Sequence, residues 1–242
     1  MEITKKIVFF LFIAASSLAT LSAQLPSQAE QLRVQIWAEL DAFPGSFEDD
    51  APPDSTAQAA ENSTAPAPFR YAIERAKEIA PFFMGGMISG WNFDYVPSDK
   101  VRNVEEFFEF EEQQPLNRAV NPVSYKRPLV EDGKLLCWAY CDRTPAQQLA
   151  YRRWSSVTHP RIRGKGTAPV EDGFAGVQAA SAGAIKNAVR EYWRIYLKNK
   201  PKEITGTVLL IGVPRVYIYE GQYVADLEFF LETDTIVKYS YY

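Results

Sequence analysis

The chain has 242 residues, 47% of them hydrophobic, so it is long enough to bury a substantial core as one domain or as two. Its net charge of −4 at pH 7 excludes the strongly basic composition that binds nucleic acid through overall charge. After the N-terminal segment no apolar run reaches the roughly 20 residues of a transmembrane helix, which excludes a membrane span in the mature chain.

The first residues have the pattern of a secretory signal peptide. Two lysines precede an apolar run over residues 7–15, and small residues follow. This order is typical of a segment that directs export and is then removed. We therefore predict a signal peptide over residues 1–23, with cleavage after Ala23 or Ala19, and a mature chain in the periplasm or the extracellular bacterial envelope.

The charges of the mature chain are distributed unevenly. Residues 24–112 contain 17 acidic and 6 basic side chains, whereas residues 113–242 contain 12 acidic and 18 basic ones. Two interpretations stay open: the halves neutralise one another within one body, or the basic half presents a surface to an anionic partner. The first predicts a single α+β body over residues 24–242, in which the acidic front part packs against the module that begins near Arg152.

The front of the mature chain predicts a strand, a loop and a short helix. Alternating apolar residues over 32–40 favour a strand, although the same residues also fit a helix. Residues 45–68 have few apolar anchors, which predicts a flexible surface loop. Residues 71–80 have helical spacing, and we expect that helix to end before Pro81. The glycines of residues 85–90 are interpreted as allowing a bulge or close packing in a strand.

A second helix is predicted around a run of glutamates. Ser98 can cap a helix that carries apolar residues of 101–108 on one face. Five glutamates lie between residues 105 and 112. Paired carboxylates can perform acid and base catalysis, but such a run is usually a solvated face. They are the candidate site of an alternative function, glycan hydrolysis, which requires two carboxylates to converge in an aromatic cleft.

A hairpin and a capped helix are predicted next. Two β-type runs, residues 124–130 and 135–140, flank an Asp-Gly turn, because Asp and Gly tolerate left-handed turn positions. Thr144 is then followed by a proline and, three residues on, by a glutamine, which is the signature of a capping box. We expect that helix to end near Trp154.

The C-terminal part is organised around one long amphipathic helix. Apolar residues recur every three or four positions over 174–199, small ones first and aromatic ones later, and Pro201 cannot continue the helix. Two β-type runs follow, residues 205–219 and 223–232, separated by a Glu-Gly turn. We predict an α+β fold, mainly an antiparallel sheet with this helix packed on it.

Two short motifs of this region carry a family resemblance. Gly-Lys-Gly-Thr-Ala at residues 164–168 precedes Ala-Ile-Lys-Asn-Ala-Val-Arg at residues 184–190, and strands follow. This order resembles the small β-α-β-β modules of bacterial envelope proteins, such as the N-terminal part of flagellar assembly protein T and related lipoproteins. The resemblance covers residues 160–232 and implies a module over 157–232 with a non-enzymatic role in the envelope or at the flagellum.

The two cysteines are Cys137 and Cys141. Residues four apart on a strand lie about 13 Å apart at roughly 3.3 Å per residue, beyond the ~7 Å that a disulfide spans. A bridge therefore requires the strand to bend or end between them. Two buried thiols and a disulfide both stay open, whereas metal binding lacks partner ligands.

One basic segment is a candidate patch for an anionic partner. Its members are Arg152, Arg153, Arg161, Arg163 and Lys165. The sole histidine, His159, has no nucleophile or acid partner in its neighbourhood, and we interpret it as structural. The sequence thus predicts no catalytic residues, cofactor or metal. It favours an exported envelope protein that binds or scaffolds, whose partner is another envelope protein or an anionic envelope polymer.

Overall fold

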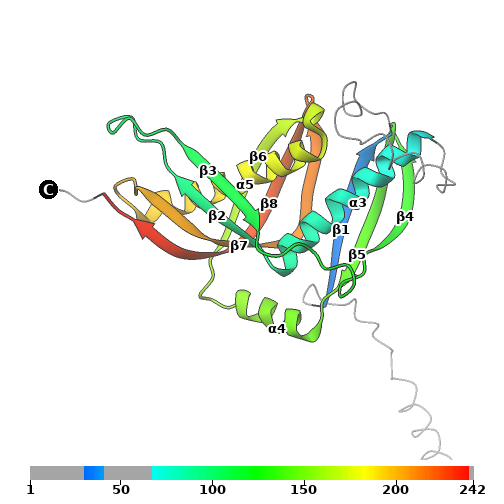
Figure 1. Ribbon diagram of the computed structural model, residues 1–242, viewed down its shortest axis with the longest axis horizontal. Helices are drawn as coiled ribbons and strands as arrows, with labels where there is room; N and C mark the ends of the chain where they lie inside the picture. The colour runs from blue at the N-terminus through cyan, green and yellow to red at the C-terminus, as the bar shows by residue number, and fades with distance from the viewer. Residues whose placement is uncertain (1–29, 41–66, 240–242) are drawn as a thin grey trace, which may run out of the picture.

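The computed structural model describes residues 30–40 and 67–239, and these residues form two antiparallel sheets and three α-helices (Figure 1). The signal peptide predicted for residues 1–23 lies outside the described residues. So does the predicted loop 45–68, apart from its last two residues, which begin a helix.

The smaller sheet has three strands in the order β1-β5-β4. They are β1 (Gln31–Glu39), β4 (Ser124–Glu131) and β5 (Lys134–Asp142). β1 is the strand predicted from its alternating apolar residues, of which Leu32, Val34, Ile36 and Ala38 are buried. β4 and β5 form the predicted hairpin, in which Asp132 and Gly133 have φ angles of 48° and 70°. The sequence therefore predicted this turn correctly.

The larger sheet has five strands in the order β3-β2-β7-β8-β6. They are β2 (Trp91–Val96), β3 (Phe107–Glu112), β6 (Arg161–Pro169), β7 (Glu203–Tyr219) and β8 (Gln222–Val237). β7 and β8 form a long hairpin whose register shifts between Ile211 and Arg215, where Gly212 has a φ of 73°. Gly212, Val213 and Pro214 thus form a bulge within one bent strand.

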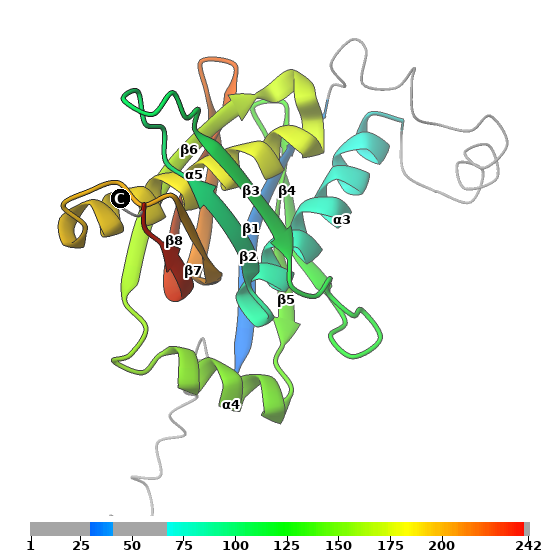
Figure 2. The same cartoon turned by 60° about the vertical axis from the view of Figure 1, so that its left-hand side comes forward.

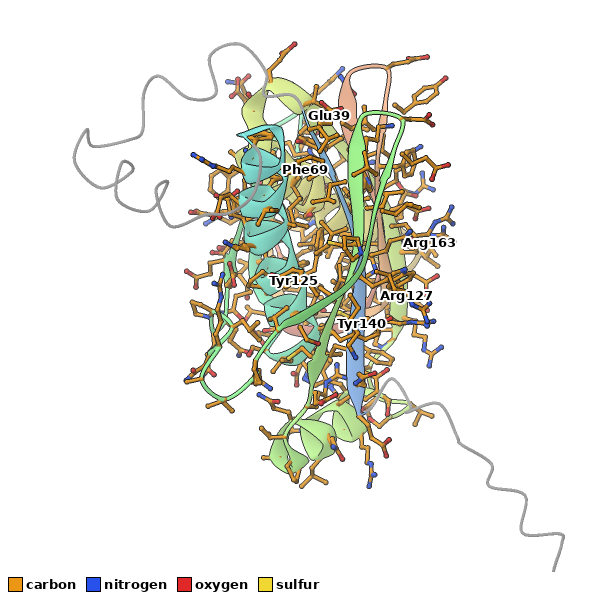
Figure 3. All side chains as sticks on the ribbon, turned by 90° about the vertical axis from the view of Figure 1, so that its right-hand side faces the viewer. Glu39, Phe69, Tyr125, Arg127, Tyr140 and Arg163 are labelled. Carbon is orange, nitrogen blue, oxygen red and sulfur yellow. The ribbon has the colours of Figure 1, made fainter. Side chains whose placement is uncertain are left out.

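Each sheet is covered by a helix on one face (Figures 1 and 2). Helix α3 (Ala67–Ile88) packs on β1 and β5, and α5 (Gly173–Tyr196), after a 3₁₀ turn at Val170–Asp172, packs on β6 and β8. The shorter α4 (Pro145–Trp154) lies at the end of the molecule that is lowest in Figure 1. Figure 3 shows Arg127, Tyr140 and Arg163 on the side turned away from α3.

One continuous apolar core joins the two sheets. It contains Ile36 and Ala139 of the smaller sheet, Phe83 of α3, and Val208 and Phe229 of the larger sheet, each with at most 1% of its surface exposed. α4 covers a second, smaller cluster on the opposite face of the larger sheet, where its Tyr151 and Trp154 pack on Leu209, Ile211 and Phe230. This arrangement is the predicted α+β fold, mainly antiparallel with one long helix packed on a sheet.

Helix α3 continues through Pro81, so the prediction that it ends before this proline is wrong. Pro81 has no N–H to donate to the carbonyl of Lys77 four residues earlier. The Arg118 guanidinium donates to that carbonyl instead, with Nη2 3.0 Å from the oxygen. The residues after the proline, Phe82, Phe83, Met84 and Met87, are buried, so core packing favours continuation of the helix.

Gly85 and Gly86 belong to α3 and not to a strand, which corrects their sequence interpretation. A Cβ on Gly86 would overlap the indole of Trp91, which is fully buried and stacks on Phe82 at a centroid distance of 4.9 Å. The prediction that a glycine here allows close packing is therefore correct, but the glycine lies in a helix and not in a strand. Gly90 ends the helix with a φ of 87°, the left-handed conformation typical of a residue after a helix.

The helix predicted after Ser98 is also wrong. Residues 97–106 form the connection of a β2–β3 hairpin, which is closed by the Asp99 and Val104 bridge. Phe108 and Phe110 face the core from β3, whereas Glu109 and Glu111 are exposed. Alternation with a period of two thus describes these residues better than the helical period.

The remaining predicted elements agree with the structure within a few residues. Thr144 caps α4 through a complete capping box with Gln147. α5 ends at Tyr196, three residues before the expected end, because Leu197 is already extended with φ −107° and ψ 112°. β6, α5, β7 and β8 follow one another in the β-α-β-β order predicted for residues 157–232. Within the described ranges, no helix is long and apolar enough to cross a membrane.

β6 and α5 approach closely through glycines. A Cβ on Gly164 or Gly166 would overlap the backbone of α5 at Ala184 or Ala180. Only a residue without a side chain allows this contact. The small residues of the first half of α5 therefore place the helix on the sheet, and its aromatic second half extends toward the β2–β3 hairpin.

Candidate binding site

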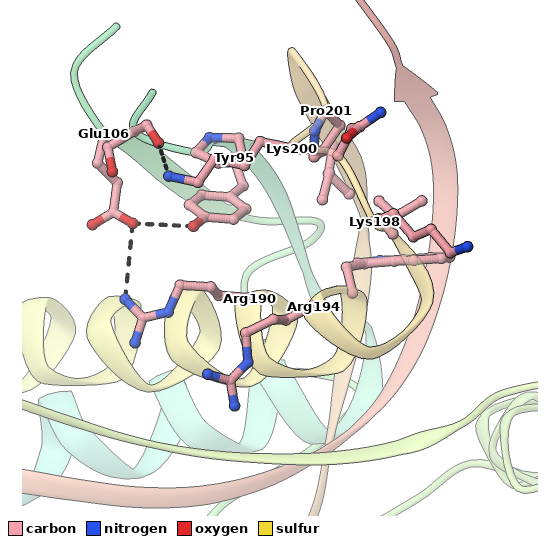
Figure 4. Close-up of a pocket in the computed structure, with 13 residues that line it drawn as sticks. Tyr95, Glu106, Arg190, Arg194, Lys198, Lys200 and Pro201 are labelled. Atoms are coloured by element: carbon pink, nitrogen blue, oxygen red, sulfur yellow. Dashed lines mark hydrogen bonds and ion pairs between the residues drawn. The ribbon is translucent and has the colours of Figure 1, made fainter. Parts of the chain in front are cut away.

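A pocket of about 430 Å³ lies between the last turns of α5 and the end of β2 (Figure 4). One wall is Tyr95 of β2 with Glu106, which directly precedes β3. The opposite wall is α5, and the far end is the turn over residues 197–201 that leads into β7. Three segments distant in the sequence thus build the site.

The Tyr95 wall is held by hydrogen bonds and an ion pair. The Tyr95 hydroxyl donates to Oε1 of Glu106 at 3.0 Å, and Nζ of Lys186 donates to Oε2 at 2.8 Å. Nη1 of Arg190 lies 3.9 Å from the same carboxylate. Burial, with the nearby charge of Glu106, raises the pKa of the Tyr95 hydroxyl above its ordinary value, so this group stays protonated.

Glu106 stays ionised in this setting. Burial by itself would raise the pKa of its carboxyl, but hydrogen bonds from Lys186 and Tyr95 and the charges of Lys186 and Arg190 outweigh burial. The pKa of Glu106 is therefore held below its usual range. Its two oxygens already accept hydrogen bonds, which makes it a support of the wall.

The other charged side chains that line the pocket are cations: Arg190, Arg194, Lys198 and Lys200. The Glu191 carboxylate, on the adjacent helix surface, forms an ion pair with Nη2 of Arg194 at 2.7 Å and lies 3.5 Å from Nε of Arg190. Lys200 donates to the carbonyl of Ser98, which connects the turn to the β2–β3 connection. Figure 4 shows the four cations along the helix and around the turn. The pocket therefore carries a net positive charge.

Trp193 contributes an unpaired donor. Its indole nitrogen is buried and has no hydrogen-bond partner among the described residues, although Trp193 lines the pocket. A buried N–H without an acceptor costs free energy, about 1 to 3 kcal/mol. Because this nitrogen is itself buried, it is a cost of the fold, and the ring of Trp193 is what lines the pocket.

These properties suit the binding of an anion that also has an apolar or planar part. Cations supply charge, while Tyr95, Trp193, Leu197 and Pro201 supply apolar surface. Nothing in the described chain indicates catalysis: residues 30–40 and 67–239 contain no group of three or more His, Cys, Asp or Glu able to hold a metal ion. The pocket has one carboxylate, Glu106, and it is already paired.

The basic patch predicted from the sequence is divided between two elements. Arg161, Arg163 and Lys165 alternate on the exposed face of β6, whereas Arg152 and Arg153 are exposed on α4. On β6, Arg163 donates two hydrogen bonds to Asp226 at 2.7 and 2.6 Å. That contact raises the pKa of Arg163 and lowers that of Asp226. The structure thus brings three of the five cations together on a face that already carries carboxylates.

Cys137 and Cys141 are both free and buried, so no disulfide joins them. β5 runs unbroken from 134 to 142, and the bend that a bridge requires is absent from this strand. Burial raises the pKa of both thiols, that of Cys141 to about 11. The alternative of two buried thiols is the one that the structure has.

His159 packs against Trp154 at a centroid distance of 4.7 Å. Its Nε2 lies 3.8 Å from Glu232, and its Nδ1 lies 3.2 Å from the hydroxyl of Thr158. These contacts fasten the end of α4 to β8, as expected of a structural histidine.

The glutamates of residues 105–112 are divided between two separate hollows. Glu109 and Glu111 point to the exposed face of the larger sheet, where they border a shallow acidic groove with Asp94 and Asp234. Glu106 lies in the pocket instead, next to aromatic side chains. Within the described residues, the carboxylates that converge therefore border a groove from which the neighbouring Phe93 and Phe110 are turned toward the core, whereas the aromatic pocket has the single carboxylate Glu106. Glycan hydrolysis requires both features in one cleft.

The pocket was not predicted from the sequence. A usable signal was present, because Arg190, Arg194 and Lys198 recur every four residues and continue past the helix end. Their partners, Tyr95 and Glu106, are about ninety residues away, and only the fold brings them together.

Comparison with known proteins places the chain in a family without giving it a role. A model of an uncharacterised protein family matches residues 19–239, so the chain belongs to that family. It is 28% identical over 211 residues to an uncharacterised protein of Treponema pallidum (strain Nichols), which covers 87% of this chain and 83% of that relative. No solved structure matches the chain.

Proposed function

We propose that this chain is an exported protein of the bacterial cell envelope that binds an anionic partner through the pocket beside α5. The observation that carries the proposal is the concentration of Arg190, Arg194, Lys198 and Lys200 around one pocket that is also lined by Tyr95 and Trp193. The role is binding or scaffolding, without catalysis. The partner is an anionic envelope polymer or an envelope protein with an acidic surface.

Export is supported by the signal-peptide pattern of residues 1–23. A role in envelope or flagellum assembly is supported by the resemblance of residues 160–232 to envelope modules. The order β6, α5, β7, β8 is compatible with that resemblance. Glycan hydrolysis is the less supported alternative, because the pocket has the single carboxylate Glu106, which Lys186 and Tyr95 already engage.

Binding is tested with a soluble polyanion, dextran sulfate, and the chain expressed from Gln24 onward. Tryptophan fluorescence should change on titration because Trp193 lines the pocket. The double variant Arg194→Gln, Lys198→Gln should bind about tenfold more weakly, a change of about 1.4 kcal/mol. The matched control is Arg152→Gln, Arg153→Gln, which removes two exposed charges from α4. Equal weakening by both pairs, or no binding at all, would contradict the proposed site.

Location is tested by fractionating cells that produce the chain. The mature protein should be found in the envelope or periplasmic fraction, and it should lack its first 19 or its first 23 residues. A cytoplasmic protein with residues 1–23 intact would contradict export.

A further inference from the structure

Three exposed apolar side chains belong to the segments next to the pocket: Val101 lies in the β2–β3 connection, and Ile195 and Tyr196 end α5. Val101, Ile195 and Tyr196 have 93%, 77% and 62% of their surface exposed. Exposed apolar residues are common singly, whereas a group with a common location marks a contact surface. α5 extends past the start of β6, so Ile195 no longer has a strand to pack against.

A second hollow joins Tyr196 to the β2–β3 connection. It measures about 260 Å³ and is bordered by Tyr196, by Lys198 and Lys200 of the pocket turn, and by Arg102, which follows Val101. Arg102 also lies over the ring of Tyr239 at 4.1 Å, which joins the β2–β3 connection to the end of β8. We call residues 98–102, 194–202 and 238–239 the basic tip.

The basic tip carries many more cations than anions. All of its lysines and arginines are exposed: Lys100, Arg102, Arg194, Lys198, Lys200, Lys202 and Lys238. Its carboxylate is Asp99, which is paired with Arg102. Long cationic side chains around exposed aliphatic and tyrosine side chains are the combination that lies in a lipid headgroup layer.

We infer that the basic tip docks on an anionic lipid surface, with a headgroup phosphate in the pocket and Val101, Ile195 and Tyr196 inserted among the headgroups. This inference rests on the proposed anion binding and assigns a lipid surface to the same site, in place of the polymer or acidic protein proposed above. A soluble polyanion would pair with the lysines but leave the three apolar side chains in water. A lipid surface satisfies both, because anionic headgroups attract Lys and Arg and the acyl boundary accepts apolar groups.

The test measures co-sedimentation of the chain from Gln24 onward with lipid vesicles. One set contains phosphatidylcholine alone, and the other contains about a third phosphatidylglycerol. Binding should occur to the anionic set and weaken as salt is raised. The triple variant Lys198→Gln, Lys200→Gln, Lys238→Gln should bind on the order of a hundredfold more weakly, since each lysine near an anionic surface contributes about 1 kcal/mol.

The apolar contribution is tested by Ile195→Ser, Tyr196→Ser, and the matched control is Val157→Ser, Leu149→Ser at the α4 end, where both side chains are also exposed. The tip pair should weaken vesicle binding at least tenfold and leave dextran sulfate binding unchanged, whereas the control pair should change neither. Circular dichroism of each variant checks that it folds.

Two results would overturn the lipid inference while the proposed anion binding stands. One is binding to dextran sulfate without binding to anionic vesicles. The other is vesicle binding that the variant Ile195→Ser, Tyr196→Ser does not weaken, because the basic tip would then bind the vesicle through charge alone. Failure to bind either probe would overturn both.

Discussion

Glu106 is the residue on which the pocket wall depends. It joins Tyr95 of β2 to Lys186 of α5, and its ion pairs with Lys186 and Arg190 connect the acidic front part to the basic part. Its effect is expected in stability and in the shape of the pocket, because its oxygens face protein donors.

Replacing Glu106 should lower stability in a pH-dependent way. The pKa of Glu106 is lower in the folded chain than in the unfolded chain, so its contribution is present above the ordinary carboxyl pKa and is lost as pH falls. We expect Glu106→Gln to lower the free energy of unfolding by about 1 kcal/mol at pH 7. Urea unfolding of both proteins at pH 7 and pH 4 checks this. A difference that grows toward pH 4 would contradict the ion-pair geometry.

The two cysteines should be inert while the chain is folded. Cys137 and Cys141 are buried, and the pKa of Cys141 is raised to about 11, so few thiolates are exposed at pH 8. An aromatic disulfide reagent should react with neither thiol in native buffer and with both after unfolding in guanidinium. If neither thiol reacted after unfolding without a reductant, the two cysteines would be joined by a disulfide, which would contradict the structure.

At the scale of elements, local signals explain which predictions are correct. The Asp-Gly turn between β4 and β5, the capping box at Thr144 and the alternation of β1 lie within a few residues of the structure that they specify. Each could be derived from spacing alone. The end of α5 was displaced by three residues because residues 197–199 carry no strong stop signal before Pro201.

The incorrect predictions have distant causes. α3 passes Pro81 because Arg118, from a loop 41 residues away, supplies the missing donor to Lys77. β3 forms because β2 supplies a paired edge, which the helical spacing of the same phenylalanines concealed. The pocket shares this origin, since its two walls come from β2 and α5, and composition could indicate an excess of cations but not where they gather.

The capping box gives a direct test at this scale. The Thr144 side chain accepts from the Gln147 amide N–H at 3.3 Å, and the Gln147 side chain accepts from the Thr144 N–H at 2.9 Å. Thr144→Ala should lower the free energy of unfolding by about 1 kcal/mol. Thr167→Ala, on the exposed face of β6, is the control and should change it by less than about 0.5 kcal/mol. Equal effects in a urea titration would contradict the capping role.

At the scale of the whole molecule, burial holds the two charge halves together. β2, from the acidic half, lies between β3 and β7, and Trp91 of β2 packs on Phe229 of β8 at a centroid distance of 6.3 Å. The ion pairs of Glu106 with Lys186 and Arg190 are partly exposed, and exposed pairs are screened within roughly 8 to 10 Å at physiological salt. Salt should therefore weaken the molecule only modestly.

The fragment 152–242 tests whether the halves form one unit. It contains β6, α5, β7 and β8 but lacks β2, so one edge of β7 loses its partner and the apolar side chains beneath it lose their cover. We expect the fragment to be much less stable than the chain from Gln24 onward, or unfolded, by circular dichroism and urea titration. Cooperative unfolding at unchanged stability would show an autonomous module and contradict the single-body account.

The central claim is that an anionic partner binds at the pocket beside α5 and not at the basic segment first indicated by the sequence. Amide hydrogen exchange of the chain from Gln24 onward, with and without dextran sulfate, tests it most directly. The account predicts slower exchange in peptides that cover residues 95–106 and 190–202, with no change over 145–165. Slower exchange confined to residues 145–165, where Arg152, Arg153, Arg161, Arg163 and Lys165 lie, or no change in any peptide, would contradict it.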